Sequence, residues 1–163
     1  MEYSKPMFTT RPAAPADAEA ITRQRRQMFL DAGLATPEQA ESMADAFTAW
    51  VRRHLEAGTY LGWLTEDTEQ ANKVVAGAGL YLLEYAPHWQ DPNPVRAYLL
   101  NFYVDPALRG RGLAGNLLLL AMEETRRRKI RVVTLHASRF GKPVYEKFGF
   151  EQTDEMRFVN KFD

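Results

Sequence analysis

Apolar residues in the first third of the chain recur mainly with helical spacing, after one short strand. The stretch Met7 to Arg11 predicts that strand. A helix is then predicted from about Asp17 to Asp31, because its apolar residues fall on one face. A second helix is predicted from Thr36 to Gly58, where Pro37 stands in the first turn and Gln39 completes a capping box with Thr36.

Beyond Gly58 the apolar residues form runs of strand length and two helical segments. Strands are predicted over residues 60–64, 74–85, 95–104 and 132–135, with closing strands at 150 and over 156–162, and helices over 113–129 and 142–148. Gly77 and Gly79 alternate within one strand, which indicates that a neighbouring element approaches closely on one face. This order of elements predicts an α/β fold, with a mixed sheet of six to seven strands and helices on both faces.

Composition narrows the possible functions. The 163 residues suffice for one domain, residues 1–163, with a sizeable core. The 21 basic and 21 acidic residues cancel, so no global charge attracts nucleic acid, and the cations Arg126 to Lys129 are expected to be solvated at a helix end. The absence of cysteine excludes disulfides, thiolate metal sites and a cysteine nucleophile. No signal or membrane-spanning segment and no metal-ligand spacing are seen, so we expect a cytoplasmic protein without metal, membrane or nucleic-acid partner.

The stretch Arg109-Gly110-Arg111-Gly112-Leu113-Ala114 carries the clearest chemical signal. It joins a predicted strand to a predicted helix, and so places unpaired N–H groups at a helix N-terminus, where phosphate binds well. The glycines leave room for a ligand, and the arginines add charge suited to phosphate oxygens. A Walker loop would need Gly-Lys followed by Ser or Thr, and a dinucleotide fingerprint would need a third glycine; neither fits. A basic turn before an amphipathic helix is the purely structural alternative.

Two motifs together resemble the GNAT superfamily of Gcn5-related N-acetyltransferases. Arg109, Gly112 and Ala114 match that family's pyrophosphate loop, Arg or Gln, two residues, Gly, one residue, Gly or Ala. The stretch His136 to Phe150 is similar to its final motif, with direct matches at Tyr145-Glu146-Lys147 and Gly149-Phe150. Ser138 stands where the family often has Asn. The resemblance covers nearly the whole chain, and it implies the GNAT-like order of elements.

The resemblance implies transfer of an acetyl group from acetyl-CoA directly to the primary amine of a small molecule or peptide, within a ternary complex. It implies that backbone groups of Phe102, Tyr103 and Val104 pair with the pantetheine arm, although core packing also explains these apolar residues. The pyrophosphate is then held across Arg109 to Ala114. Tyr145 is implied as the general acid for the CoA sulfur and as a cofactor contact, with Ser138 as a further hydrogen-bonding residue.

The general base is harder to identify. Strict alternation puts Tyr98, Leu100 and Phe102 on the face expected to point at the substrate, and none is a base, while Asn101 is expected to be structural. We rank Glu84 first, acting through water, although a solvated strand-end carboxylate is its structural alternative. His88 is a further candidate, His54 is expected on a helix surface, and an amine that arrives neutral needs no base.

The acceptor pocket is expected between the two early helices, the loop 88–94 and the C-terminal strands. Its candidate lining residues are Trp50, Tyr60, Trp89 and Tyr98. The absence of a base on the central strand keeps a second function open, a catalytically silent acyl-CoA-binding regulatory domain. Apolar residues in the C-terminal segment leave both a monomer and a homodimer open.

Overall fold

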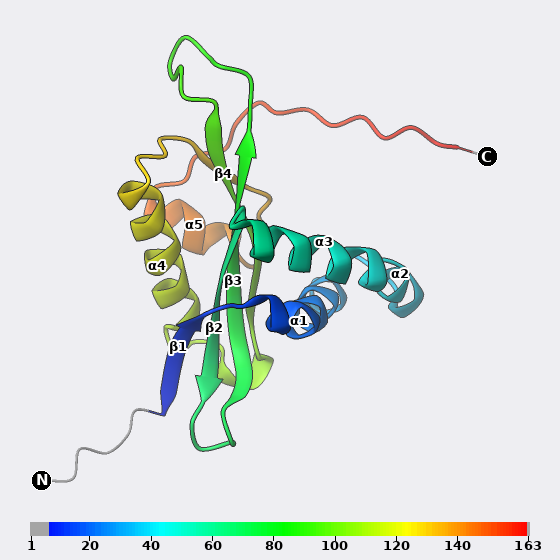
Figure 1. Cartoon of the computed structure of the whole chain (residues 1–163). Coiled ribbons are helices and arrows are strands. Elements are labelled where there is room, and N and C mark those ends of the chain that lie inside the picture. The colour runs from blue at the N-terminus through cyan, green and yellow to red at the C-terminus, as the bar shows by residue number, and fades with distance from the viewer. Residues whose placement is uncertain (1–6, 163) are drawn as a thin grey trace, which may run out of the picture.

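A five-stranded mixed sheet runs through the computed structural model, which describes residues 7–162 (Figure 1). The strands are β1 (Phe8–Pro12), β2 (Tyr60–Asp67), β3 (Lys73–Glu84), β4 (Val95–Val104) and β5 (Val133–Leu135). They lie in the spatial order β1-β2-β3-β4-β5; neighbours are antiparallel except β4 and β5, which are parallel. The mixed α/β fold with helices on both faces is therefore confirmed.

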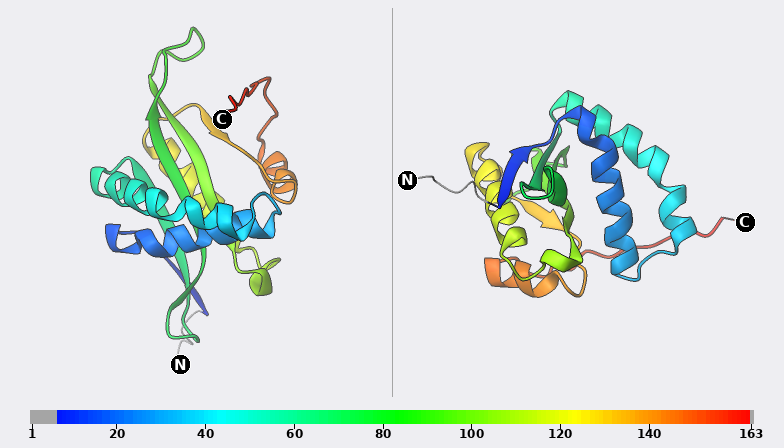
Figure 2. Two further views of the ribbon diagram at one scale, coloured as in Figure 1. Left: turned by 90° about the vertical axis from the view of Figure 1, so that its right-hand side faces the viewer. Right: turned by 90° about the horizontal axis from the view of Figure 1, so that it is seen from below.

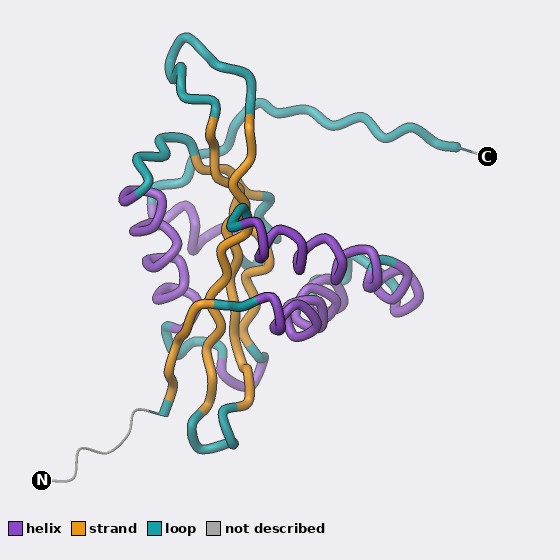
Figure 3. Tube along the Cα trace, in the orientation of Figure 1, coloured by secondary structure: helices purple, strands orange, loops and turns teal. Residues whose placement is uncertain are grey.

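Helices cover the two faces of the sheet in separate groups (Figures 2 and 3). One group contains α1 (Ala18–Asp31), α2 (Pro37–Ser42) and α3 (Ala44–Ala57); the other contains α4 (Leu113–Arg127) and α5 (Lys142–Phe148). Short 3-10 helices span Pro15–Asp17 and Pro106–Leu108. The first group buries Ile21, Phe47 and Val51 against β2, and the second buries Leu118 and Ala121 against β3 and β4.

The capping residues of the second predicted helix behave as expected, but the helix is divided. Thr36 accepts a hydrogen bond from the Gln39 N–H at 3.2 Å, and the Gln39 side chain accepts one from the Thr36 N–H at 2.9 Å. The Ser42 hydroxyl donates to the Gln39 carbonyl at 2.8 Å, a local bond of the kind that competes with regular helix geometry. The chain bends at Met43 and resumes as α3, which ends at Gly58 with φ 69°.

The close approach predicted at the two strand glycines is confirmed. A Cβ atom on Gly77 would lie 2.2 Å from Oε1 of Gln24 on α1, and one on Gly79 would lie 2.1 Å from the Tyr60 hydroxyl. Only glycine leaves room for these two side chains, which therefore lie directly on the sheet.

A β-bulge interrupts the central strand β4. Gly77 pairs with Tyr103 and Gly79 pairs with Leu100. An advance of two residues along β3 therefore corresponds to three residues along β4, so β4 carries one extra residue. Asn101 adopts the left-handed conformation there, with φ 57°. Leu100 packs on the α1–α3 face and Phe102 on the α4–α5 face. The predicted shared face of Tyr98, Leu100 and Phe102 is therefore wrong, because one extra residue reverses the alternation.

The prediction of closing strands at Phe150 and over residues 156–162 is wrong, because the structure has no strand there. Phe150 packs into the core beside β5, but residues 150–162 form no helix or strand and residues 151–162 are exposed. The sheet consequently has five strands instead of the predicted six to seven. The alternating apolar residues have strand character, yet a strand forms only where a partner supplies hydrogen bonds. Within the described residues, no helix is long and apolar enough to cross a bilayer.

Candidate functional site

The loop before α4 presents an open helix N-terminus. Gly110 and Gly112 have φ values of 79° and 81°, in the left-handed region that glycine tolerates. Gly112 is the N-cap residue of α4, and no side chain caps this helix. The loop residues 109–112 are exposed, and a Cβ on either glycine would meet no atom within 4 Å. An anion can therefore approach the first amide groups of α4 directly.

The two arginines of this loop have different surroundings. The Arg109 guanidinium forms an ion pair with Asp31 at 2.7 Å and donates to the Val104 carbonyl at 3.2 Å. Arg109 thereby braces the loop against α1 and the end of β4. Arg111 forms no ion pair within residues 7–162, and its guanidinium only approaches the sulfur of Met7 at 4.0 Å. Arg111 is therefore the loop cation that is free to meet an anionic ligand.

Strands β4 and β5 pair over a short distance and then separate. Pairing joins Ala97, Tyr98 and Leu99 to Val133, Thr134 and Leu135. Beyond Leu99, residues 100–104 have no strand beside them on the β5 side, although Tyr103 and Val104 still pair with β3. This stretch includes Phe102, Tyr103 and Val104, which the family resemblance implies as cofactor contacts. An extended molecule with amide groups fits such a half-paired strand.

A buried polar network supports the bulge from the α1 side. The Arg25 guanidinium donates to Oδ1 of Asn101 at 2.7 Å, and Nδ2 of Asn101 donates to the Tyr60 hydroxyl at 3.0 Å. Asn101 is only 3% exposed. The guanidinium also lies over the rings of Phe29 and Phe47, 4.8 and 4.7 Å from their centroids. Asn101 therefore links α1, β2 and β4 through its side chain.

Burial in this network shifts the pKa values of Arg25 and Tyr60. Burial lowers the pKa of the Arg25 guanidinium, which forms no ion pair with any described residue. Burial also raises the pKa of Tyr60 to about 12, against the lowering effects of the Asn101 hydrogen bond and the Arg25 charge. A fixed positive charge thus lies behind the bulge. Sequence reasoning missed Arg25, although a cation four residues after Ile21 falls on the apolar face of α1.

Tyr98 and His136 meet where β4 and β5 begin to separate. The Tyr98 hydroxyl hydrogen-bonds Nδ1 of His136, the first residue after β5. Burial raises the pKa of the Tyr98 phenol, while a hydrogen bond with the His136 backbone and the charge of Arg25 lower it. Sequence reasoning assigned no role to His136, although a polar residue that directly follows a strand parallel to its neighbour is a positional signal for a site.

Tyr145 lies on the opposite face from Arg25. Its ring contacts those of Phe102 and Phe150, with centroids 6.0 and 5.7 Å apart. Burial raises the pKa of the Tyr145 phenol to about 12, so the proton stays on the oxygen at neutral pH. The Ser138 hydroxyl accepts from the Gly141 N–H at 3.1 Å, and a Cβ on Gly141 would lie 3.1 Å from the Tyr145 ring. Ser138 therefore lies close to Tyr145.

Neither of the two candidates for the general base, Glu84 and His88, contacts Tyr98, His136 or Tyr145. Glu84 pairs with Val95 at the hairpin end of β3 and β4, three residues before Tyr98 and six residues before Asn101 along β4. A strand rises about 3.3 Å per residue, so the stretch from Val95 to Asn101 puts Glu84 about 20 Å from the bulge. His88 lies further out, in the hairpin loop, where its N–H bonds the Asp91 carbonyl at 3.0 Å (Figure 1).

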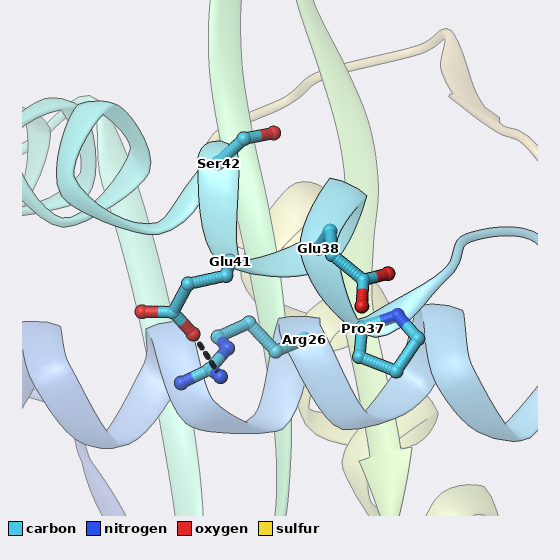
Figure 4. A pocket seen from close by; sticks show the side chains of 5 residues that line it. All are labelled: Arg26, Pro37, Glu38, Glu41 and Ser42. Carbon is cyan, nitrogen blue, oxygen red and sulfur yellow. Dashed lines mark ion pairs between the residues drawn. The ribbon is translucent and has the colours of Figure 1, made fainter.

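The four aromatic residues expected to line an acceptor pocket are also not gathered together. Tyr60 is 1% exposed and belongs to the core with Trp50, whereas Trp89 is 84% exposed on the hairpin loop. A hollow of about 570 Å³ does lie between α1 and α2 (Figure 4). It is lined by Arg26, Pro37, Glu38, Glu41 and Ser42, and Arg26 is already paired with Glu41. None of the predicted site residues borders this hollow.

The described residues contain no group of three or more His, Asp or Glu side chains that could hold a metal ion. The polar groups of the site are instead the open amides before α4, the Tyr98–His136 pair, Tyr145 and the Arg25–Asn101 network.

Comparison with known proteins gives consistent results. A family model described as an acetyltransferase (GNAT) domain matches residues 34–163. An uncharacterised N-acetyltransferase of Escherichia coli K12, YjgM, is 30% identical over 141 residues, which cover 85% of this chain and 78% of that protein.

Solved structures agree over nearly the whole chain. A GCN5-related N-acetyltransferase from Ralstonia eutropha JMP134 superposes with a TM-score of 0.87 at 35% identity, covering 94% of this chain and 98% of its own. A protein from Clostridium acetobutylicum described as a predicted acetyltransferase, crystallised with acetyl-CoA, gives a TM-score of 0.86 at 27% identity, with coverages of 94% and 96%.

Proposed function

The chain belongs to the GNAT acetyltransferase family, and on this premise we propose that it moves an acetyl group from acetyl-CoA directly to a primary amine of a small molecule or peptide. Donor and acceptor bind together in one ternary complex. The observation that carries this proposal is the continuity of two features. The unpaired side of β4 leads straight into the uncapped N-terminus of α4.

The proposed donor site follows this path. Backbone groups of Phe102, Tyr103 and Val104 hydrogen-bond the pantetheine amides as a neighbouring strand would. The amides of residues 109–114 hold the pyrophosphate, with Arg111 supplying charge and Arg109 holding the loop in place. Ser138 lies near enough to Tyr145 to hydrogen-bond the same arm. Acetyl-CoA itself contributes an acetyl thioester, which is already activated for attack by an amine.

Tyr145 is the proposed proton donor. As the amine nitrogen bonds to the acetyl carbon, the carbon–sulfur bond breaks and negative charge develops on sulfur. The Tyr145 phenol is neutral at physiological pH because its pKa is about 12, so it donates a hydrogen bond to that sulfur throughout the step. The proton that the thiolate finally takes comes from Tyr145, which recovers one from solvent.

The acceptor amine must lose a proton before or during attack. We assign this step to the Tyr98–His136 pair, because it borders the gap between β4 and β5 and joins a phenol to an imidazole by a hydrogen bond. Glu84 was the first candidate from sequence, but it lies about 10 Å from Tyr98 along the sheet, too far to act through one water, so the proposal uses the pair in its place.

A turnover assay tests the proposal. Purified protein is incubated with acetyl-CoA and a panel of primary amines, and release of free CoA thiol is measured. We expect turnover with at least one amine, and loss of that turnover in Tyr145→Phe. The matched control is Tyr85→Phe, since Tyr85 is exposed on the hairpin. Binding of CoA without turnover on any amine would favour the alternative, a silent acyl-CoA-binding regulatory domain.

A further inference from the structure

Arg25 of α1 is a cation without a counterion on the α1–α3 face of the sheet. It forms no ion pair with any residue of 7–162. The groups whose charge acts on it are the phenols of Tyr60 and Tyr98, and both are neutral at pH 7 because burial raises their pKa from the ordinary value of 10.0. A guanidinium that is partly withdrawn from water without an anion is costly, so this one calls for a partner that the described chain does not provide.

The hydrogen bonds of this guanidinium are also incomplete. Nη1 donates to Oδ1 of Asn101 at 2.7 Å. Nε is buried and has no hydrogen-bond partner, and Nη2 is not buried and donates to no described residue. Native proteins leave few buried N–H groups unpaired, so an open donor of this kind points to a missing acceptor. Nη2 is the donor that an acceptor from solvent meets first.

The guanidinium is held in place before any ligand arrives. It lies over the rings of Phe29 and Phe47, with its central carbon 4.8 and 4.7 Å from their centroids. The Asn101 hydrogen bond fixes it from the β4 side. A ligand that binds such a side chain does not have to order it, which favours affinity.

The surface between Arg25 and Tyr98 is open and shared by both. Tyr98 pairs with Tyr81, which packs against the α1–α3 core, and paired residues of antiparallel strands point to the same face. Leu100 packs on that face as well. Arg25, Tyr98 and Leu100 are each only half-buried, although β4 lies inside the sheet. Tyr98 and the residue that holds Arg25, Asn101, are three positions apart, about 10 Å along the strand.

We propose that Arg25 binds a carboxylate of the acceptor, so that the amine substrate of this protein is an aminocarboxylic acid. This inference rests on the proposed function, in which the Tyr98–His136 pair takes the proton of the amine. With its carboxylate on Arg25, a small acceptor extends along β4 toward that pair, and its carbons lie on Leu100. The carboxylate accepts hydrogen bonds from the donors that Asn101 leaves free, beginning with Nη2. One guanidinium carries one charge, which fits a carboxylate better than a doubly charged phosphate.

Turnover of matched acids and amides tests the assignment. Glycine, β-alanine, γ-aminobutyrate and ε-aminocaproate are each compared with their own primary carboxamide, and kcat/KM is measured from release of CoA thiol. The series increases the distance between amine and carboxylate stepwise. At least one acid should have a kcat/KM at least ~10-fold above that of its amide, the scale of a charge-assisted hydrogen bond. Equal kcat/KM for every acid and its amide overturns the proposal.

Variants of α1 then assign the preference to one side chain. Arg25→Gln should lower the ratio of kcat/KM for the acid to that for the amide at least ~10-fold, and comparing ratios between proteins cancels the different basicity of the two amines. Arg25→Lys keeps the charge but loses the forked donors, so its ratio should fall less. Arg23→Gln is the matched control, because Arg23 lies on the same helix but is exposed, and its ratio should match that of the wild type.

Circular dichroism checks that these variants are folded, and Arg25→Lys carries the comparison if Arg25→Gln does not fold. A merely structural role of Arg25 would lower the kcat/KM of acid and amide alike and leave their ratio unchanged. An unchanged ratio in the folded Arg25 variants, or an equal fall in Arg23→Gln, overturns the proposal.

Calorimetry separates this inference from the proposed function. Each acid of the series is titrated into the protein in the presence of CoA, which has no acetyl group to transfer. Binding of an acid by the wild type and Arg23→Gln, at least ~10-fold weaker in Arg25→Gln, supports the carboxylate site even if no amine is acetylated, and then only the proposed function fails. Acetylation of amines without any preference for acids leaves the proposed function in place and overturns this inference, as does the absence of binding by every acid.

Discussion

At the residue scale, the least predictable position of the molecule is Asn101. Strict alternation placed it opposite Leu100, but the bulge brings both to the α1 side. The pattern of apolar residues does not reveal the cause of this bulge. The bulge needs one residue that tolerates φ 57° and that also hydrogen-bonds both Arg25 and Tyr60. Asparagine meets both needs, since its short amide side chain favours the left-handed region and can donate and accept.

The first prediction concerns this residue. Asn101→Ala should lower the free energy of unfolding by about 2–3 kcal/mol, because it leaves buried partners unsatisfied and keeps a Cβ in the left-handed region. Asn101→Gly loses the same hydrogen bonds but relieves the backbone strain, so it should be less destabilised by about 1 kcal/mol. Urea unfolding of both variants measures the difference. An alanine variant as stable as the glycine variant would contradict the strain at this position.

The second prediction concerns Tyr145. Tyr145→Phe should lower kcat by roughly 100-fold, the low end of the usual effect of a lost acid catalyst, while the Kd for CoA changes little. Because the pKa of this phenol is about 12, its proton remains in place below that value. Ionisation of Tyr145 should therefore cause no fall in wild-type kcat between pH 7 and about pH 10. Equal kcat values for Tyr145→Phe and the wild type would exclude it as the proton donor.

The third prediction follows from the buried phenol of Tyr60. Its pKa is raised from 10.0 to about 12 in the folded protein, so its contribution to stability is complete below pH 10 and is lost as pH rises toward 12. Tyr60→Phe removes this dependence. Urea midpoints measured at pH 9 and pH 11 should fall less in Tyr60→Phe than in the wild type. An identical fall in both proteins would show that Tyr60 does not titrate upon unfolding.

At the element scale, most helices and strands could be predicted because their apolar residues repeat with a clear period. The helix before Gly58 and the glycine-containing strand β3 are examples, and the capping box at Thr36 marks a helix start correctly. The break at Met43 was not predicted, because helical apolar spacing continues across it from Met43 to Phe47 and Trp50. Of the candidate site, the residues themselves indicated the loop before α4 and the family resemblance indicated Tyr145, and both roles stay predictions. Arg25 and His136 were missed, because their positions depend on tertiary contacts.

The fourth prediction concerns the C-terminal end of α4. Glu124 forms ion pairs with Arg127 at 2.5 Å and Arg128 at 2.6 Å, and hydrogen bonding to Arg127 and Arg128 lowers the pKa of Glu124 from 4.5 to about 2. A lowered pKa stabilises the fold above pH 4.5, and this stability is lost as pH falls toward 2.

Glu124→Gln should therefore unfold more easily than the wild type at pH 7, by about 0.5 kcal/mol for such surface pairs. The difference should shrink as pH falls below 4.5. Chemical unfolding at pH 7 and pH 4 measures it, and Glu123→Gln serves as a control on the exposed side of the helix. A difference that grows on acidification would contradict the assigned direction.

At the scale of the whole molecule, the order of elements determined the fold class correctly but could not determine the number of strands in the sheet. The segment 156–162 has strand periodicity, and a sequence does not say whether a strand edge lies within reach to pair with it. The same holds for the candidate site, which is assembled from α1, β4, β5, the loop before α4 and α5. Only their packing shows that Glu84 lies about 20 Å from the bulge and that Tyr98 and His136 are joined by a hydrogen bond.

The central claim, that the open N-terminus of α4 binds the pyrophosphate of CoA, is tested most directly by calorimetric titration of CoA. The wild type and Gly33→Asp should bind CoA with similar Kd, because Gly33 also has positive φ, at 65°, but lies at the end of α1. Gly112→Asp should bind at least ~10-fold more weakly, since its carboxylate occupies the N-cap position and repels phosphate. Equal affinity in all three folded proteins, or no binding by the wild type, would contradict the account.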